Sequence, residues 1–287
     1  MSLVLTAESS RGAAKSVPAG AAPQGWPLRR YGAMNWRGLW SHSKRGVQAF
    51  INEGLFFLGG PMVTASMFLA VFVLATSDEA GGPNSAQAII LYVGPGIIAF
   101  MLLHQAFQHA GAMLIEDKHE GVIADILMAP LSPGEVFAGY VFAATTTAFM
   151  VGGSVLLLML LITDLPVTQP MALLGFALLG ALLFALIGTL VGLWAEKWEH
   201  YSAAESFLIL PLGVLSGAFF SIEALAEGWR WAIAFNPAHY VVEGFRWSMI
   251  GEANVAPLIA AAVLLAIDLI LAALAWRLFS VGYRLKP

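Results

Sequence analysis

Uncharged apolar runs long enough to cross a membrane constrain this chain more than any other feature. Residues 54–76, GLFFLGGPMVTASMFLAVFVLAT, contain no charged side chain over 23 positions. A helix rises about 1.5 Å per residue, so this run would extend about 35 Å, against a bilayer core of about 30 Å. With 59% hydrophobic residues, 11% charged residues and a mean hydropathy of +0.78, the composition indicates a polytopic membrane protein.

Six such segments are present, which predicts an all-α fold with six transmembrane helices. The other five lie at about 86–115, 136–163, 170–194, 201–222 and 257–279. Residues 1–30 are rich in Ala, Gly, Ser and Pro and lack an apolar signal-peptide core, so we expect a disordered cytoplasmic leader. The predicted domains are therefore this leader, an amphipathic interfacial helix at 31–53 and a transmembrane domain at 54–287.

The basic residues are unevenly distributed between the segments. The loops at 77–85 and 164–169 contain no Lys or Arg. If both termini are cytoplasmic, twelve of the 14 basic residues fall on the cytoplasmic side, and Arg230 and Arg246 are the exceptions. The positive-inside rule therefore predicts an even number of spans with both termini in the cytoplasm. The loop at 116–135 then faces the cytoplasm as well.

The segment before the first span has two distinct helical faces. One face is apolar and consists of Trp36, Leu39, Trp40, Val47, Phe50 and Ile51. The other is polar and basic and consists of Arg37, Ser41, Lys44, Arg45, Gln48 and Asn52. This pattern is typical of a helix that lies in the membrane interface. The pattern fits a simple anchor and a coupling element equally well.

The stretch between the fifth and sixth spans, 221–256, is too polar to span and too apolar for a free loop. Its aromatic residues fit an interfacial belt: Trp229, Trp231, Phe235, Tyr240, Phe245 and Trp247. The Asn236-Pro237 pair would divide the stretch into two short helices. We therefore expect a re-entrant hairpin in the outer leaflet, with its backbone covered by protein.

Two acids fall inside predicted spans. Asp268 lies near the middle of the sixth, where a lone charge costs at least about 2.5 kcal/mol on insertion scales. It must face protein or a polar cavity, or be protonated. Its role is either a proton or substrate contact, or a hydrogen bond within the bundle or across a dimer interface. Glu205 lies about one turn inside the fifth span, and we interpret it as a structural residue at the inner gate.

Motifs for catalysis are missing from the sequence. It contains no G-x-x-x-x-G-K-[ST] loop, and LSGAF at 215–219 lies in an apolar span where it cannot serve as an ATPase signature. There is no cysteine, and His104 and His109 are about 140° apart on a helix, a poor metal pair. We therefore expect no enzymatic activity, cofactor, metal or nucleic-acid partner for this chain itself.

One charged insert interrupts the apolar pattern. In EDKHEGVIADILMAP, residues 116–130, four charges fall within five positions, followed by Asp125. Val122, Ile126 and Leu127 have helical spacing, and Pro130 would let the chain turn back toward the membrane. The insert is predicted to be a short cytoplasmic helix between the second and third spans.

Two motifs in this order on six spans resemble the ABC-2 family of exporter permeases. The first is EDKHEGVIADILMAPLSPGEVFAGY at 116–140, and the second is LSGAFFSIEALAEGWRWAIAFNPAHYVVEGFRWSMIG at 215–251. Within the family, the N-terminal region is similar to small bacterial permeases that pair with a separately encoded ATPase. His119 and Glu120 stand where members commonly carry Arg or Lys, so this insert is more acidic.

The resemblance implies a half-transporter in the bacterial inner membrane, with two copies of this chain and two of an ATPase that binds ATP and Mg. The insert would then be the ATPase-coupling helix, with its charges on the partner's surface and its apolar residues as anchors. The implied coupling residues are Glu116, Asp117, Lys118, Glu120, Gly121, Val122, Asp125, Ile126, Leu127 and Pro130. The implied residues of the re-entrant motif are Trp229, Asn236, Pro237, Tyr240, Glu243 and Arg246.

Family analogy makes the cargo a lipid, glycolipid, polysaccharide or hydrophobic drug. A second hypothesis is a proton-coupled secondary transporter that uses Asp268 and Glu205, although no internal repeat between the two halves is visible. A third is a membrane-embedded enzyme, which would need acids and histidines that converge at one membrane face.

Overall fold

The computed structural model describes residues 34–52, 54–80, 83–220 and 233–285, and every regular element within those ranges is helical. This confirms the all-α prediction for the described part of the chain. The predicted leader at 1–30 lies outside the described residues, and so does Trp229 of the re-entrant motif.

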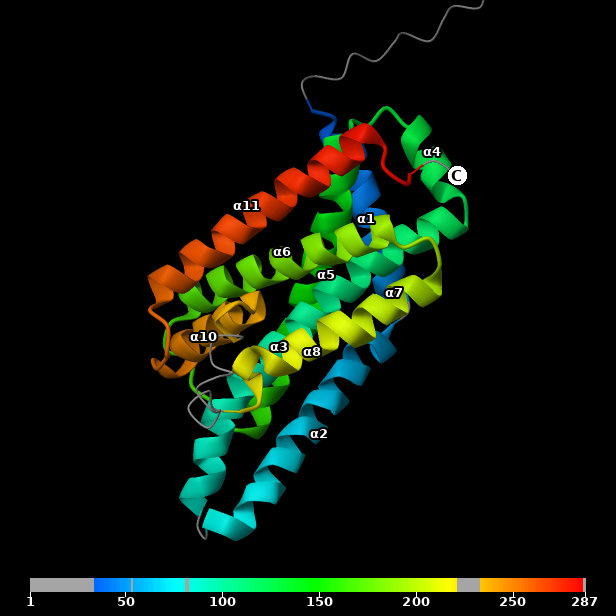
Figure 1. The fold of residues 1–287 in the computed structure, drawn as a ribbon. Coiled ribbons are helices and arrows are strands. Elements are labelled where there is room, and N and C mark those ends of the chain that lie inside the picture. The colour runs from blue at the N-terminus through cyan, green and yellow to red at the C-terminus, as the bar shows by residue number, and fades with distance from the viewer. Residues whose placement is uncertain (1–33, 53, 81–82, 221–232, 286–287) are drawn as a thin grey trace, which may run out of the picture. The chain divides into compact units, whose positions relative to one another are not determined.

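Six helices are long and apolar enough to cross a membrane, as the sequence predicted (Figure 1). They are α2 (Leu55–Ala80), α3 (Pro83–His119), α5 (Pro133–Ile162), α6 (Pro170–Trp194), a broken helix over residues 198–218, and α11 (Pro257–Val281). Three shorter helices complete the described fold: α1 (Trp36–Asn52), α4 (Val122–Met128) and α10 (Pro237–Ile250). Two helices extend farther than predicted. Helix α2 continues to Ala80 instead of ending at 76, and α3 continues through the charged run to His119 instead of ending near 115.

The core of the bundle forms where α3 packs against α6. A Cβ added at Gly188 would lie 2.4 Å from the carbonyl oxygen of Phe107, and one added at Gly192 would lie 2.9 Å from that of Gly111. Close backbone contact through small residues is how membrane helices associate without a hydrophobic driving force between them. The two glycines of α6 therefore fix α3 as the central helix of the bundle.

The fifth span is a helix with two π-helical segments. It consists of α7 (Trp198–Ala204), η1 (Glu205–Ile209), α8 (Leu210–Gly213) and η2 (Val214–Ala218). Pro211 lies in α8 and has no N–H to donate, which disturbs the regular ladder. The span ends where Gly217 adopts a φ of 84°, a conformation that favours glycine.

Helix α1 packs on α5 through a stripe of small and polar residues, not through its predicted apolar face. His42, Ser43, Gly46 and Phe50 are buried, whereas Trp36 and Trp40 are 68% and 60% exposed. Of the predicted apolar face, Phe50 is buried and Trp36, Trp40 and Ile51 are exposed, and the placement of α1 in the membrane interface stays a prediction. A helix that lies in an interface leaves its large apolar residues to lipid, and its small residues allow close helix contact.

Candidate functional site

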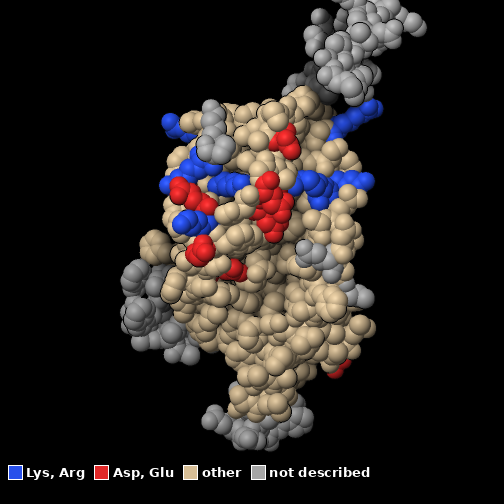
Figure 2. Space-filling model, turned by 90° about the vertical axis from the view of Figure 1, so that its right-hand side faces the viewer, with Lys and Arg blue, Asp and Glu red and all other residues tan. Residues whose placement is uncertain are grey.

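Charged side chains gather toward one end of the face shown in Figure 2, and much of the remaining described surface there is uncharged. The ends of α3, α6 and α11, the beginning of α5, and the short helix α4 meet in one buried cluster. We call this part of the molecule the α4 end.

Helix α4 is separated from its neighbours by well-defined turns. Gly121 precedes it with a φ of 75°, the left-handed conformation that only glycine adopts at little cost, and so ends α3. After Pro130, Ser132 caps α5: its hydroxyl accepts from the backbone N–H of Glu135, and the Glu135 side chain accepts from the N–H of Ser132. These turns set α4 apart as an independent seven-residue helix.

The buried face of α4 differs in part from the predicted anchors. Ile123 and Ile126 are 4% and 9% exposed and belong to a cluster that also contains Leu193 of α6 and Phe279 of α11. Val122 is half-buried, whereas Leu127, predicted as an anchor, is 45% exposed. Apolar residues recur at helical spacing on both sides of α4. The sequence alone therefore could not tell whether the side with Ile123 and Ile126 or the side with Leu127 packs against the bundle.

The outer face of α4 combines acids with large apolar side chains. Asp125, Leu127 and Met128 are exposed, and Met128 is 77% exposed. Glu120, just before the helix, is exposed as well. We call Glu120, Asp125, Leu127 and Met128 the α4 surface. It offers carboxylates to cationic groups and two apolar side chains to a hydrophobic pocket.

Asp117 lies inside the protein and not on the surface, contrary to the expectation that it contacts a partner. Its side chain is 4% exposed and accepts hydrogen bonds from both terminal nitrogens of Arg45, at 2.7 and 2.5 Å. The hydroxyl of Tyr140 donates to the same carboxylate at 2.6 Å. These hydrogen bonds to Asp117 raise the pKa of Arg45 and keep its charge in place. The charge of Asp117 thus joins α1, α3 and α5.

Lys118 also binds within the chain. Its Nζ donates to the carbonyl oxygens of Gly192, Leu193 and Ala195 at 2.8, 2.6 and 3.1 Å. These carbonyls lie at the C-terminus of α6, where a cation is favoured by unpaired acceptors and by the helix dipole. Lys118 therefore fastens the end of α3 to the end of α6.

The beginning of α1 holds the segment that leaves α4. The backbone N–H of Asn35 donates to the carboxylate of Glu135, and the side-chain amide of Asn35 donates to the carbonyl of Pro130 at 3.0 Å. Farther along α1, the ring of His42 packs edge-on against Tyr140 with centroids 4.7 Å apart. Burial lowers the pKa of His42 to about 4, with a further contribution from the charge of Arg45. Helix α1 thus contacts α5 and the linker after α4.

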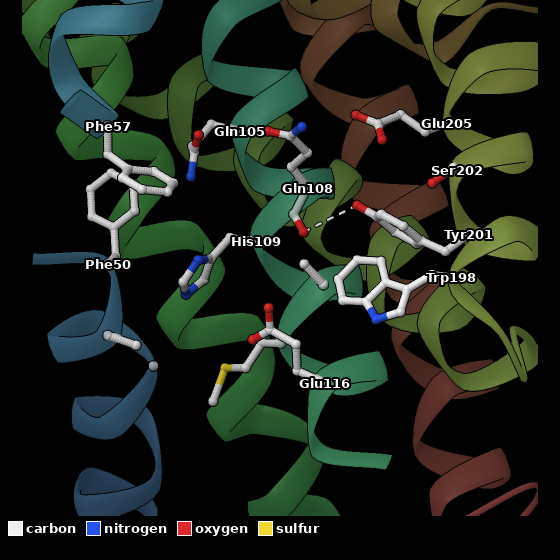
Figure 3. Close-up of a pocket in the computed structure, with 14 residues that line it drawn as sticks. Phe50, Phe57, Gln105, Gln108, His109, Glu116, Trp198, Tyr201, Ser202 and Glu205 are labelled. Atoms are coloured by element: carbon white, nitrogen blue, oxygen red, sulfur yellow. Dashed lines mark hydrogen bonds between the residues drawn. The ribbon is translucent and has the colours of Figure 1, made fainter. Parts of the chain in front are cut away.

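A polar cavity of about 340 Å³ lies between α1, α2, α3 and the beginning of the fifth span (Figure 3). In Figure 3, Phe50 and Phe57 lie on the left and residues of the fifth span on the right, with residues of α3 between them. The α3 residues are Gln105, Gln108, His109 and Glu116, and those of the fifth span are Trp198, Tyr201, Ser202 and Glu205. The hydroxyl of Tyr201 donates to the carbonyl of Gln108 at 3.1 Å, and Nε2 of His104 lies 3.0 Å from a carboxylate oxygen of Glu205. No Lys or Arg is among the described residues that line this cavity.

The second motif forms a separate network around α10. Asn236 caps α10 by accepting from Ala238 N at 3.0 Å, and its amide donates to the carbonyl of Leu212 at 2.7 Å. His239 Nδ1 lies 3.0 Å from the carbonyl of Ser216, and Arg246 donates to that of Gly217 at 3.0 Å. The motif residues therefore satisfy carbonyls along the broken fifth span.

Glu243 and Arg246 form an ion pair inside the protein, at 1% and 3% side-chain exposure. Arg246 also lies over the ring of Tyr92, 4.0 Å from its centroid, and Glu243 accepts from the backbone N–H of Asn254.

The other residues of the motif form the beginning of α10. Pro237 is the first residue of α10, and the Tyr240 hydroxyl donates to Ala234 O at 2.8 Å. Phe245 is 2% exposed, so it belongs to the core and not to an interfacial aromatic belt. With 14 residues α10 extends about 21 Å and is too short to span.

Comparison with known proteins identifies relatives over most of the chain. Residues 37–250 match the family model described as ABC-2 type transporter. The chain is 24% identical over 251 residues to the inner membrane transport permease YadH of Escherichia coli K12, a match that covers 88% of this chain and 98% of the relative. The YadH protein of Shigella flexneri matches over the same shares at the same identity.

Proposed function

Because the chain belongs to the ABC-2 type transporter family, we propose that this transport permease is the membrane-spanning subunit of an ATP-driven exporter. A separate ATPase binds ATP and Mg and supplies the energy. The observation that carries this proposal is the α4 surface. A short helix holds Ile123 and Ile126 in the bundle and leaves Asp125, Leu127 and Met128 exposed for another protein.

The contacts of α4 support a role as the coupling helix. Its buried cluster includes Leu193, Phe279 and Leu285, so a displacement of α4 acts on the ends of α6 and α11 together. The Arg45–Asp117–Tyr140 contacts connect the same region to α1. In the proposed complex, two copies of this chain form a homodimer, two ATPases bind its cytoplasmic side, and both termini of each chain are cytoplasmic.

The polar cavity of Figure 3 supports an uncharged or cationic head group for the cargo. Glu116 and Glu205 line it without any lysine or arginine, so a strongly anionic group would meet carboxylates there. Trp198 and Phe50 also line the cavity and give it an apolar, aromatic surface. We therefore propose a lipid-like molecule, glycolipid, polysaccharide or hydrophobic drug as cargo, with Glu205 at the inner gate.

The alternative of a proton-coupled transporter needs Asp268 and Glu205 on one path. Glu205 lines the polar cavity beside α3, whereas Asp268 lines a different concavity formed by α5, α6 and α11. The two lining sets share no residue. This separation favours the ATP-driven function over proton exchange between the two acids.

The proposal is tested by purifying the chain from its native host in mild detergent and identifying the bound proteins by mass spectrometry. We expect a soluble ATPase at equal stoichiometry. Recovery of the chain alone, together with proton-driven flux in reconstituted vesicles, would refute the ATP-driven function.

A further inference from the structure

A concavity on the side of the bundle formed by α5, α6 and α11 contains polar atoms that the fold does not satisfy. Asp268 is 6% exposed, and neither of its carboxylate oxygens has a hydrogen-bond partner among the described residues. The hydroxyl of Thr145, 8% exposed, has no partner there either. Both residues line the same space of about 660 Å³, which we call the α5–α6–α11 groove.

The rest of the groove is apolar and aromatic. Phe137, Phe142 and Phe149 come from α5, Leu182 comes from α6, and Leu265 comes from α11. Pockets of about 300–1,000 Å³ with apolar walls and a few polar groups are typical of small-molecule sites. The groove has this size and composition, whereas the cavity of Figure 3 is lined by more polar residues.

The depth of the two polar residues narrows the choice of occupant. Asp268 is the twelfth of the 25 residues of α11, and Thr145 is the thirteenth of the 30 residues of α5. Both therefore lie near mid-membrane, about 15 Å from the head groups of ordinary phospholipids. Acyl chains reach this depth and can fill the groove, but they leave an acid without a donor, which is costly in hydrocarbon.

We propose that the α5–α6–α11 groove binds a membrane-dissolved hydrophobic amine, with its ammonium group on Asp268 and its apolar body between the phenylalanines. The amine supplies both the opposite charge and the hydrogen-bond donors that the carboxylate lacks. The aromatic side chains that line the same groove are groups that can attract a cation through their ring faces. A second copy of the chain fits less well, because face-to-face pairing would bring one concavity against another. This inference concerns a site separate from the polar cavity and from α4.

The chain provides its own comparison site. A second groove of about 570 Å³ is lined by Gly59, Met62, Val63, Ser66, Met67, Ala70 and Leu158 and contains no charged residue. It lies on α2 and α5 and is also apolar. A probe that binds only through its hydrocarbon part should label both grooves, whereas a probe that needs the acid should prefer the α5–α6–α11 groove.

The experiment uses the purified full chain in phosphatidylcholine nanodiscs and three photoreactive probes. The probes are dodecylamine, dodecanol and dodecane, each with the same diazirine at mid-chain, and adducts are located by peptide mass spectrometry. We expect the amine to label residues 137–149 and 265–272 about tenfold more than the alkane, a factor that one moderate ionic contact supplies. The three probes should label the second groove equally.

Two variants connect the labelling to the acid. Asp268→Leu should reduce amine labelling to the level of the alkane. Asp268→Asn keeps the shape and an acceptor, so it should abolish the preference for amine over alcohol, and it serves as the test if Asp268→Leu does not fold. Thr145→Val should have a smaller effect, because the hydroxyl adds no charge.

Three outcomes would overturn the proposal. Equal labelling of the α5–α6–α11 groove by all probes would show that hydrocarbon alone occupies it. An amine preference that survives Asp268→Asn would place the recognition elsewhere. Labelling of the purified chain that disappears in native membranes, with a copurified polypeptide crosslinked to the groove, would identify a protein helix as the occupant.

Discussion

The α4 end and the α10 region each contain an arginine–carboxylate pair, but the two pairs are set in different surroundings. Glu243 and Arg246 lie on one helix at 1% and 3% exposure, and they bind each other and backbone groups of the protein. Arg45 and Asp117 lie on different helices, and the Arg45 side chain is 42% exposed. The first pair fixes one rigid assembly of α10 with the fifth span, whereas the second joins two helices through a buried carboxylate and a partly exposed guanidinium.

This difference matters because a buried ion pair and a partly exposed one respond differently when one partner is removed or the two side chains separate. Removing one partner of a buried pair leaves an uncompensated charge, so the structure either keeps the whole network or loses it. A pair with one exposed member can exchange its protein contact for water at lower cost. The Arg45–Asp117 pair is therefore the one of the two that can separate at lower cost.

The largest effect is expected from Arg246→Met, which leaves Glu243 buried and unpaired. Such a loss costs about 3–5 kcal/mol, so we expect a strong fall in melting temperature or no monodisperse protein by size-exclusion chromatography. The double variant Glu243→Gln with Arg246→Met removes both charges and should recover part of the stability. An Arg246→Met chain that melts like the wild type would show that the buried pair is not a clamp.

An intermediate effect is expected from Asp117→Asn, which removes the charge that holds Arg45. Losing a charge-assisted hydrogen bond costs about 1–3 kcal/mol, so α1 should separate from α5 more often. The chain has no cysteine, which allows a single Ser43→Cys reporter at a position 2% exposed. We expect faster maleimide labelling of Ser43→Cys in the Asp117→Asn background.

The matched control for this measurement is Ser41→Cys, an exposed position on the same helix. Its labelling rate should not change with Asp117→Asn, because it is already accessible. Equal rates at Ser43→Cys with and without Asp117→Asn would mean that the ion pair does not hold α1 in place.

The sequence predicted the six spans because each is a long, predominantly apolar run, and length and apolar composition together decide whether a helix can cross a bilayer. It also placed α1, α4 and the helix that begins at Pro237 close to their observed positions. Orientation about the helix axis was harder to predict. On α1 the small residues Ser43 and Gly46 turned inward while the tryptophans stayed exposed.

The charged run shows why part of the site could not be predicted. Glu116, Asp117 and Lys118 are neighbours in sequence, but they project from successive positions of the last turns of α3 in different directions. Asp117 meets Arg45 and Tyr140, and these partners lie 72 and 23 residues away. Lys118 meets carbonyls that no side-chain pattern reveals. Such long-range pairing depends on packing that local sequence does not encode.

A smaller effect is expected from pH at the α1–α5 contact. The folded pKa of His42 is about 4, below its ordinary value of 6.5, so the separated or unfolded state binds the proton more readily. The contribution of neutral His42 to the free energy of unfolding is therefore fully present above about pH 6.5 and is lost as the pH falls toward 4. We expect a loss of about 1 kcal/mol between pH 7.5 and 5.5, measured as a lower melting temperature.

His42→Phe should remove this part of the pH dependence, because the ring remains and the proton does not. The control is His119→Phe, which replaces an exposed histidine at the end of α3 and should leave the dependence unchanged. If wild type and His42→Phe lose the same stability between pH 7.5 and 5.5, the buried histidine is not the cause.

Substitutions at the α4 surface are expected to have the smallest effect on folding and a large effect on function. Asp125→Ala with Leu127→Ala removes an exposed acid and an exposed apolar side chain, so the melting temperature should not change. If α4 binds the ATPase, the same variant should lose most of the copurifying ATPase or uncouple hydrolysis from transport. The control Glu252→Ala with Leu258→Ala changes an exposed acid between α10 and α11 and an exposed leucine at the beginning of α11. Both positions are away from α4, so this variant should keep the partner. Full transport by the α4 variant would mean that the α4 surface is not where the ATPase acts.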